Sequence, residues 1–393
     1  MFKYYLKAIV ILFFCSCGRS NDIEKNKDKE SSQKNSFEFE RIGTKKFPLD
    51  STTAGGGSNF QYVENEGKKL LCYLNTNQNT LIFYDYEQET LEYQLSIEKK
   101  GPNGVGEISG FLVHSTDSIF VYSNSGVRLY HLNQSGKIIN IYDPKAKEDG
   151  LIIRPYVSGS MPMMKRGKHI ILNSWGSQKE YYNNDTYPES LLLRVNLETK
   201  EMDYGFSYPE IYTKGVWGMQ LHVMYNMLNP ETSEIVVGFP IDDHLYVLGE
   251  GYVKKHPQGS KYFKGVVPLS TKSKISPPPP NQEVQNERSQ TTYRTIHYDP
   301  YNEIYIRVVH KAISEEVLAM NDPVKSVFPK ASLMIMDKEF KKLGEVDFDN
   351  NDYWINNIFI NENGIHIMKM DFVNEDVLTF DVFDLKFPGT GKN

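Results

Sequence analysis

The stretch between Gly106 and Pro144 alternates short apolar runs with turn sequences rich in Asn, Asp, Ser and Gly. The runs predict four β-strands, at 107–114, 117–123, 127–132 and 137–142. In the second of these strands, Ile119 and Val121 point to one face of the sheet and Phe120 points to the other. A sheet that is apolar on both faces is expected to lie between two other sheets.

This strand pattern recurs along the chain. Hairpins that join an inner strand to the next strand are expected at 60–74, 111–123, 164–175, 225–239, 296–309 and 358–370. Hairpins that join outer strands are expected at 81–95, 129–141, 192–204 and 333–346, with a weaker copy at 244–255. Six copies of the first hairpin predict an all-β fold, a six-bladed β-propeller with four antiparallel strands in each blade. Seven blades are the alternative, if residues 262–275 contain further strands.

The two ends of the folded region are expected to meet. The last blade provides strands at 355–361, 364–370 and 377–384 and then lacks its outermost strand. The segment 37–43, FEFERIG, is a spare strand before the first complete hairpin. We expect it to pair with the last blade and to close the ring, which leaves that sheet without a free edge. The alternative is that it only borders the first blade beside 90–97.

The first residues have the features of a secretory leader. Two lysines precede an apolar run at 8–14 that is too short to span a bilayer, and Ser16 and Cys17 follow it. This pattern resembles a bacterial lipoprotein signal, in which the cysteine is acylated and becomes the first mature residue. Ordinary secretion is the alternative interpretation.

The residues after the leader cannot bury enough apolar surface to fold, because 18–36 contain a single large apolar residue among charges, Asn and Ser. We therefore expect three parts. These are a signal peptide at 1–17 with lipidated Cys17, a disordered tether at 18–36 and a single propeller domain at 37–393.

Composition limits the classes of partner. The chain has 44 basic and 50 acidic side chains and a net charge of −6, and no basic run of the kind that binds nucleic acid. Nucleic acid is therefore excluded as a partner, whereas a membrane is expected through the lipid. Once the leader is removed, Cys72 has only the acylated Cys17 as a possible partner, so we expect Cys72 to be a small buried apolar residue.

No pattern in the sequence indicates catalysis. The nine histidines are scattered without a close metal-ligand spacing, and there is no GxSxG motif. No catalytic residue, metal or cofactor is therefore expected. Three insertions, at 176–190, 254–292 and 311–330, are expected to be loops that either meet a ligand or decorate the surface. The second contains a run of four prolines, and the third is expected to include one short helix before Asn321.

Several of these features together carry a resemblance. The leader ending in Cys17, the charged tether, and the motifs GPNGVGEISGF, DSIFVYS and HYDPYNEIYIR resemble envelope lipoproteins of Bacteroidetes-type bacteria. The chain is similar to the domain of unknown function 4221 family, which is related to six-bladed, TolB-like propellers. The resemblance covers nearly the whole mature chain and implies the fold and an outer-membrane or periplasmic setting. It implies no activity and no site residues.

The first hypothesis for function is a lipid-anchored envelope module that binds or scaffolds a glycan, a peptide or a protein partner. Its ligand would meet the mouth of the central channel, where the ends of inner strands lie. The candidates there are His114, Arg154, Tyr156, His222, Tyr225, Arg294 and His297. Such aromatic, Arg and His side chains bind sugars, carboxylates or peptides, but each could equally pack between blades.

The alternative hypothesis is an envelope polysaccharide hydrolase or lyase with its site in the central channel. Such an enzyme needs carboxylates or a metal site that converge from distant blades. Several Asp, Glu or His side chains within hydrogen-bonding reach at the channel mouth would favour the enzyme. An aromatic or uncharged mouth would favour binding.

Overall fold

A computed structural model describes residues 36–53, 59–65, 67–143, 154–175, 180–186, 190–320, 329–348, 352–370 and 376–388. All of these belong to one compact unit, residues 35–393. The expected signal peptide 1–17 with Cys17, and the tether 18–36 except Ser36, lie outside the described residues. No helix in the described part of the chain is long and apolar enough to cross a membrane.

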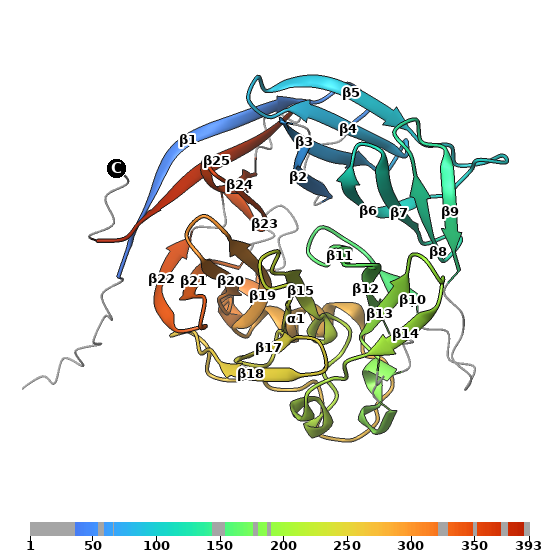
Figure 1. Cartoon of the computed structure of the whole chain (residues 1–393). Coiled ribbons are helices and arrows are strands. Elements are labelled where there is room, and N and C mark those ends of the chain that lie inside the picture. Colours follow the sequence, from blue (N-terminus) through green and yellow to red (C-terminus); the bar gives the residue numbers. More distant parts are fainter. Residues whose placement is uncertain are drawn as a thin grey trace, which may run out of the picture. The chain divides into compact units, whose positions relative to one another are not determined.

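Six antiparallel sheets are arranged around a centre as the blades of a propeller (Figure 1). Blade 1 contains β2 (Phe60–Asn65), β3 (Lys68–Asn75), β4 (Thr80–Asp85) and β5 (Thr90–Ser96). Blade 2 contains β6 (Ile108–Ser115), β7 (Ser118–Ser123), β8 (Arg128–Leu132) and β9 (Ile138–Tyr142). Blade 3 contains β10 (Arg154–Tyr156), β11 (Met164–Arg166), β12 (His169–Trp175), β13 (Leu192–Asn196) and β14 (Met202–Gly205).

The remaining three blades complete the ring. Blade 4 contains β15 (Tyr225–Leu228), β16 (Ile235–Gly238), β17 (His244–Leu248) and β18 (Val253–Pro257). Blade 5 contains β19 (Thr292–Asp299), β20 (Ile304–His310), β21 (Ala331–Asp337) and β22 (Lys342–Phe348). Blade 6 contains β23 (Tyr353–Asn361), β24 (Gly364–Lys369), β25 (Val377–Lys386) and β1 (Glu38–Pro48). The expected six blades are confirmed, and residues 262–275 contribute two isolated bridges, Val216–Ser270 and Asn183–Lys274, in place of a seventh blade.

Apolar side chains from facing blades form the core, as the alternation in β7 predicts. Ile119 and Val121 are fully buried against blade 1, in a cluster that includes Cys72. Phe120 points the other way, into a cluster with Leu193 of blade 3. Cys72 is thus the buried apolar residue expected from the sequence, and burial raises the pKa of its thiol.

The ring closes between the two ends of the domain, as expected. Strand β1 pairs antiparallel with β25 from Glu38 opposite Lys386 to Pro48 opposite Val377, with a bulge between Arg41 and Gly43. It is the outermost strand of blade 6 and extends further than the expected segment 37–43. The chain's first and last strands therefore share one sheet.

Blade 3 departs from the regular pattern at its inner edge. Strands β10 and β11 both pair with β12, and a loop at 157–163 lies between them. Within this loop, Ser158 and Met161 form an isolated bridge. Gly110 of β6 lets the loop come close, because a Cβ atom there would lie 2.3 Å from Cγ1 of Val157.

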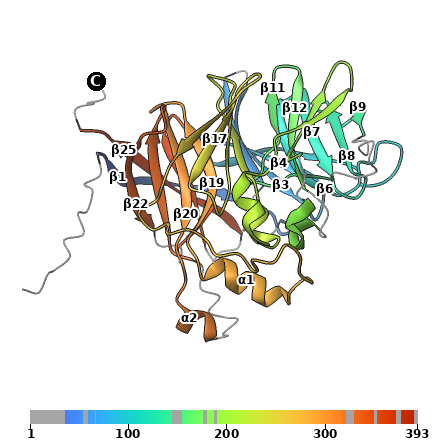
Figure 2. The same cartoon turned by 90° about the horizontal axis from the view of Figure 1, so that it is seen from below.

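The long connections lie on one face of the ring. Strands of a blade alternate in direction and all innermost strands start on the same side, so connections alternate between two faces. The face where innermost strands start carries the connections 176–191, 206–224, 258–291 and 311–330, and we call it the insertion face. It includes α1 (Pro280–Arg288) and α2 (Glu315–Ala319), which lie on the same side of the ring in Figure 2. The opposite face has short turns, such as 116–117, 133–137 and 249–252.

Candidate functional site

The candidates from blades 2 and 3 and the following connection lie in different surroundings. His114 is exposed on β6, and partial desolvation of its ring together with the charge of Lys165 lowers its pKa. Arg154 and Tyr156 lie in β10, where Tyr156 is half-buried and the side chain of Arg154 is outside the described residues. His222 lies in a 3-10 helix of the connection 206–224 and is 1% exposed.

Tyr156 and His222 are brought together, because both line a cavity of about 10 Å³ between blades 3 and 4. A cavity of this size holds no more than one water molecule. Burial lowers the pKa of His222 to about 4, although a hydrogen bond with the Gly218 carbonyl opposes the shift. This pair therefore provides a neutral, packed histidine and no room for a larger ligand.

The candidates from blades 4 and 5 include a second pair. Arg294 of β19 donates from Nη1 to the Tyr225 hydroxyl of β15, at 2.9 Å. His297, further along β19, lies 3.1 Å from the Thr295 hydroxyl, and burial lowers the pKa of His297 to about 4. Of the seven candidates, the structure thus joins Tyr156 with His222 and Tyr225 with Arg294.

Arg294 is the centre of a larger polar cluster that spans three blades. We call it the Arg294 cluster, and it comprises Tyr225, Glu287, Arg294, His310 and Asn356. Glu287 of α1 forms an ion pair with Arg294, and their side chains are 9% and 11% exposed. Arg294 also donates from Nε to Nδ1 of His310 at 3.2 Å, and the side-chain amide of Asn356 lies 3.4 Å from Nε2 of the same ring. The cluster connects the innermost strands β15, β19 and β23 through α1 and β20.

The protonation state of His310 follows from these contacts. Burial, with the nearby Arg294 and Arg288, holds the pKa of His310 well below its usual value, so the ring is neutral. A guanidinium can only donate, so Nδ1 accepts and the ring proton is on Nε2. The atom of Asn356 placed next to Nε2 is the side-chain nitrogen, so Asn356 accepts this proton only with its carboxamide flipped. The charge of Arg294 is balanced by Glu287, so a ligand carboxylate would bind Arg294 only if Glu287 left.

Helix α1 is fixed to the propeller by two buried carboxylates that sequence reasoning missed. Glu283 and Glu287 are one turn apart and therefore lie on the same side of the helix. Glu283 accepts hydrogen bonds from the Tyr182 hydroxyl at 2.8 Å and from the main-chain N–H of Gln220 at 2.9 Å. The last of the four prolines, Pro280, occupies the first helical position, where proline is favoured, and could have indicated the start of this helix.

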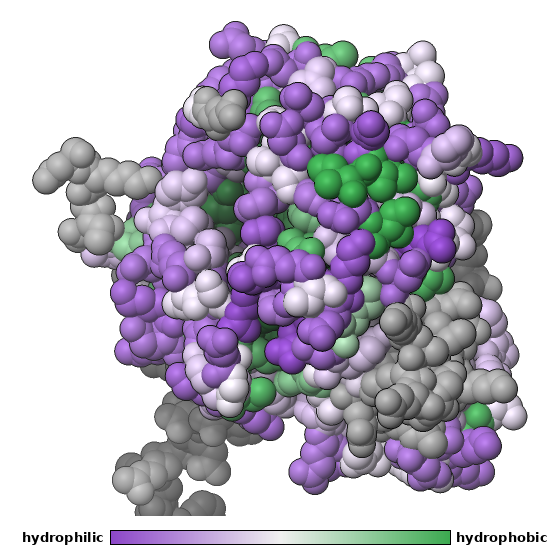
Figure 3. All heavy atoms as spheres, turned by 45° about the vertical axis from the view of Figure 1, so that its right-hand side comes forward, coloured by the Kyte–Doolittle hydropathy of each residue, from purple (hydrophilic) through white to green (hydrophobic). Residues whose placement is uncertain are grey.

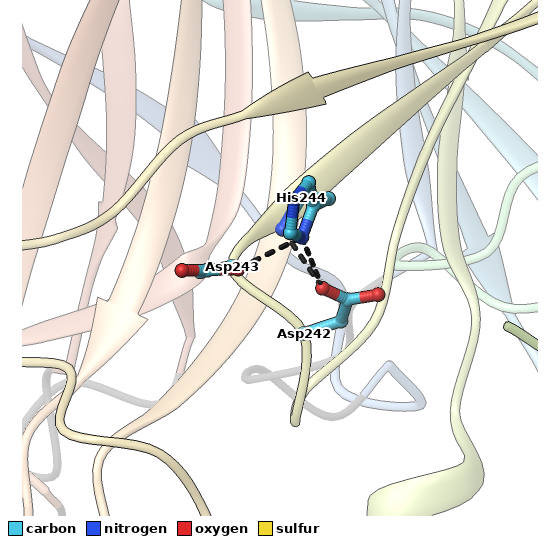
Figure 4. Close-up of side chains that lie close together, drawn as sticks. All are labelled: Asp242, Asp243 and His244. Carbon is cyan, nitrogen blue, oxygen red and sulfur yellow. Dashed lines mark hydrogen bonds and ion pairs between the residues drawn. The ribbon is translucent and has the colours of Figure 1, made fainter. Parts of the chain in front are cut away.

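A second polar group was also missed from the sequence. Asp242 and Asp243 lie in the turn between β16 and β17, and His244 is the first residue of β17; one ligand atom from each lies within 4.8 Å of the others (Figure 4). Nδ1 of His244 is 2.7 Å from a carboxylate oxygen of Asp242 and 2.8 Å from one of Asp243. The Tyr246 hydroxyl donates to the other oxygen of Asp242 at 2.6 Å. These side chains could offer three ligand atoms to a divalent ion, one from each residue.

The turn that carries this group is held from the neighbouring blade. Arg307 of β20 is fully buried and donates from Nη2 to the carbonyl oxygens of Asp242 at 2.9 Å and Phe239 at 3.2 Å. Its guanidinium lies 3.6 Å from the ring centre of Tyr293, and burial lowers the pKa of Arg307 to about 10. The turn joins the second and third strands of blade 4, so the three side chains do not belong to an innermost strand.

A cavity of about 160 Å³ lies where β2 and β6 start, next to the loop 157–163. Residues 59–61, 110–112, 157–159, Pro162 and Met163 line it, and we call it the β2–β6 cavity. It is large enough for a six-membered ring or one amino-acid residue, since a cavity of about 150 Å³ accommodates benzene. None of the seven candidates lines this cavity.

Exposed apolar side chains of the described residues are spread over several blades. The side of the molecule in Figure 3 is mostly hydrophilic, with small hydrophobic areas between polar ones. Exposed large apolar side chains of the described residues include Ile42, Leu91, Ile139, Ile141 and Val253. These lie on the outermost strands of four different blades, so they do not mark one common interface.

Comparison with known proteins places the chain in a family. The model of the family described as domain of unknown function DUF4221 matches residues 36–347, and the chain therefore belongs to the DUF4221 family. A solved member of this family from Bacteroides vulgatus is 20% identical, with a TM-score of 0.77 over 90% of this chain and 99% of that chain. A protein from Bacteroides fragilis, provisionally named as exported, is 10% identical, with a TM-score of 0.52 over 88% of this chain and 95% of that chain. No curated protein matches the chain.

Proposed function

We propose that this DUF4221 propeller is a lipid-anchored module of the cell envelope that binds a peptide, glycan or protein partner on its insertion face. The observation that carries the proposal is the gathering of the long connections 176–191, 206–224, 258–291 and 311–330 on that face. Long loops on a rigid scaffold are the usual place of ligand contact. The β2–β6 cavity lies beside the starts of the innermost strands, on the same side.

Binding explains the buried acidic groups of this face better than catalysis does. Glu283 and Glu287 hold α1 against the blades, and Glu345 of β22 accepts hydrogen bonds from Ser260 at 2.5 Å and from the amide of Lys261 at 3.0 Å. Each of these carboxylates is occupied in attaching a long connection. A catalytic acid or base needs a free path to substrate.

One observation favours the alternative of an envelope polysaccharide hydrolase or lyase. Asp242, Asp243 and His244 are within hydrogen-bonding reach of one another, which is the kind of group that acid–base or metal-assisted chemistry uses. They lie away from an innermost strand, which makes this function the second candidate. Substitution of both aspartates by Asn abolishes turnover under this alternative, whereas the first proposal requires no turnover.

Blocking each face in turn tests the first proposal. A cysteine introduced at exposed Lys264, on the insertion face, or at exposed Gln134, in the β8–β9 turn of the opposite face, can carry a polyethylene glycol maleimide. Cys72 is fully buried and stays unlabelled. On arrays of envelope peptides and glycans, the full chain labelled at 264 is expected to lose at least tenfold in retention, whereas the chain labelled at 134 retains its ligands. Equal retention of both labelled chains would contradict the proposal.

The anchor is tested separately. If Cys17 carries the lipid, the Cys17→Ala chain is expected to move from the membrane fraction to the soluble fraction with an unchanged melting temperature, because the propeller starts well after it. Lipid-bearing peptides in mass spectra of the unmodified chain provide the direct readout. An unchanged membrane fraction with no lipid on Cys17 would rule out this anchor. The setting that we propose is the outer membrane, facing the periplasm or the cell surface.

A further inference from the structure

The inner edges of blades 1 and 2 leave main-chain hydrogen-bonding groups free at the β2–β6 cavity. Strands β2 and β6 are each the innermost strand of their sheet, so one edge of each has no neighbouring strand. In an antiparallel ladder, the N–H and C=O of alternate residues point to opposite edges. The hydrogen bonds made by neighbouring residues therefore show which residues point to the free edge.

On β6, the main-chain N–H and C=O of Phe111 point to the free edge. The side-chain amide of Gln61 donates to the main-chain carbonyl of Val113 at 2.9 Å and accepts from the main-chain N–H of Val113 at 2.8 Å. The main-chain N–H and C=O of Val113 therefore point away from β7. Phe111 lies two residues earlier in the same uninterrupted pairing with β7, and its N–H and C=O point the same way. No hydrogen bond of the described residues uses these two groups.

On β2, the main-chain N–H and C=O of Phe60 point to the free edge by the same reasoning. The Leu74 amide donates to the Asn59 carbonyl at 3.0 Å, so the pair Asn59–Leu74 is hydrogen-bonded and the next pair, Phe60–Tyr73, is not. The N–H and C=O of Phe60 therefore point away from β3. They too have no partner within the described part of the chain. Phe60 and Phe111 both line the β2–β6 cavity, which thus contains two donor–acceptor pairs.

Gln61 shows what kind of group these edges accept. Its carboxamide presents a donor and an acceptor side by side and forms hydrogen bonds with both main-chain groups of Val113, as a neighbouring strand would. The same complement is offered by one residue of an extended peptide, whose N–H and C=O both point to one side. A hydroxyl of a sugar offers donor and acceptor on a single atom and matches this spacing less well.

We propose that the β2–β6 cavity binds one residue of an extended peptide, whose N–H and C=O pair with Phe111 as Gln61 pairs with Val113. The proposal rests on the proposed binding function and identifies its ligand class as peptide. The volume of about 160 Å³ limits the enclosed part to about one residue. Leu112, Val157 and Met163 line the same cavity beside polar Asn59, Gln61 and Ser158, so a small side chain such as that of Ala or Val fits it.

The probe is acetyl-Val-Ala-Val-Ala-amide, added to the detergent-solubilised full chain and observed by saturation-transfer NMR. Saturable binding is expected. A matched set of probes, each N-methylated at one amide, is expected to contain one member that binds about 3- to 10-fold more weakly, because it lacks the hydrogen bond to the Phe111 carbonyl. Equal affinity of all N-methylated probes would show that the main chain is not read and would overturn the proposal.

Two variants locate the interaction. Ser158→Trp fills the cavity from the exposed loop side and is expected to abolish peptide binding, while an unchanged melting temperature shows that the ring is intact. Gln61→Ala frees the N–H and C=O of Val113 and lengthens the open edge of β6. It is expected to raise the affinity for a hexapeptide of the same repeat about 3- to 10-fold, a gain that a merely structural role of Gln61 does not produce.

The outcomes separate this inference from the proposed function. If the peptide fails to bind but N-acetylglucosamine or another glycan binds and is blocked by the label at 264, the binding function holds and the peptide assignment is wrong. If the peptide binds and Ser158→Trp does not weaken it, the peptide site lies elsewhere. If no peptide, glycan or protein is retained, both proposals fail.

Discussion

Deletion of residues 37–48 is expected to unfold the propeller or to lower its melting temperature by far more than any single surface change. The segment contains all of β1, which pairs with β25 along its whole length and supplies the outer strand of blade 6. Phe47 is fully buried against Tyr84 and Phe380, and Phe39 stacks on Phe383 at a ring distance of 4.8 Å. Removal of a buried Phe side chain alone costs about 3–5 kcal/mol. The deletion also exposes the edge of β25 to aggregation.

Circular dichroism melting and the onset of light scattering measure this effect. The smaller deletion of 37–43, which removes the strand only up to its bulge, is expected to cost several kcal/mol and less than the larger deletion, because Phe47 is kept. Deletion of 18–34 is the control and is expected to leave the melting temperature within a degree or two. A melting temperature equal to that of the full chain after deletion of 37–48 would mean that β1 does not contribute to closure.

The blades and the closure could be predicted because both depend on local alternation. Ile119, Phe120 and Val121 assign their two faces by spacing alone, and the last blade was visibly one strand short. The segment 37–43 was then the remaining strand of the right pattern. Its true end at Pro48 was not predicted, because the Thr and Lys residues after the bulge lack an apolar period until Phe47.

The polar clusters could be predicted only in part. Arg294 and Tyr225 were candidates because they lie near the ends of inner strands. Nothing in the sequence pairs Arg294 with Glu287 of α1 or with His310. Those contacts depend on where the insertion 258–291 returns to the ring. The free edges at Phe60 and Phe111 were invisible for another reason, since every residue except proline has the same main-chain groups.

Asp381 is expected to make the largest contribution of any single ionisable group to closure of the ring. It is 1% exposed in β25 and accepts hydrogen bonds from Arg41 at 2.9 Å and from Thr44 at 2.7 Å, both in β1. Tyr353 of β23 donates to it at 2.7 Å, so one carboxylate joins three strands of blade 6. Asp381→Asn is expected to reduce the free energy of unfolding at pH 7 by about 2–4 kcal/mol, because an NH2 group replaces one accepting oxygen of a buried carboxylate and its charge is lost.

The pH dependence distinguishes the charge of Asp381 from its packing. Burial raises the pKa of Asp381, but the hydrogen bonds from Arg41, Thr44 and Tyr353 outweigh it, so the pKa lies below the usual 3.8. A carboxyl with a depressed folded-state pKa stabilises the fold above its unfolded pKa of about 3.9 and loses that contribution as the pH falls through the folded value.

The difference in unfolding free energy between the wild-type chain and Asp381→Asn, measured by urea denaturation, is therefore expected to be full at pH 7 and pH 5 and to shrink below about pH 4. Asp203→Asn breaks the ion pair with Arg194 in blade 3, where both side chains are more than half exposed, and is expected to change stability by less than about 0.5 kcal/mol. If the difference in unfolding free energy stays constant down to pH 3, the shape of the Asp381 side chain, and not its charge, stabilises the pairing with β1. A loss as small as that of Asp203→Asn would show that β1 is held to β25 by its main-chain pairing and its aromatic residues alone.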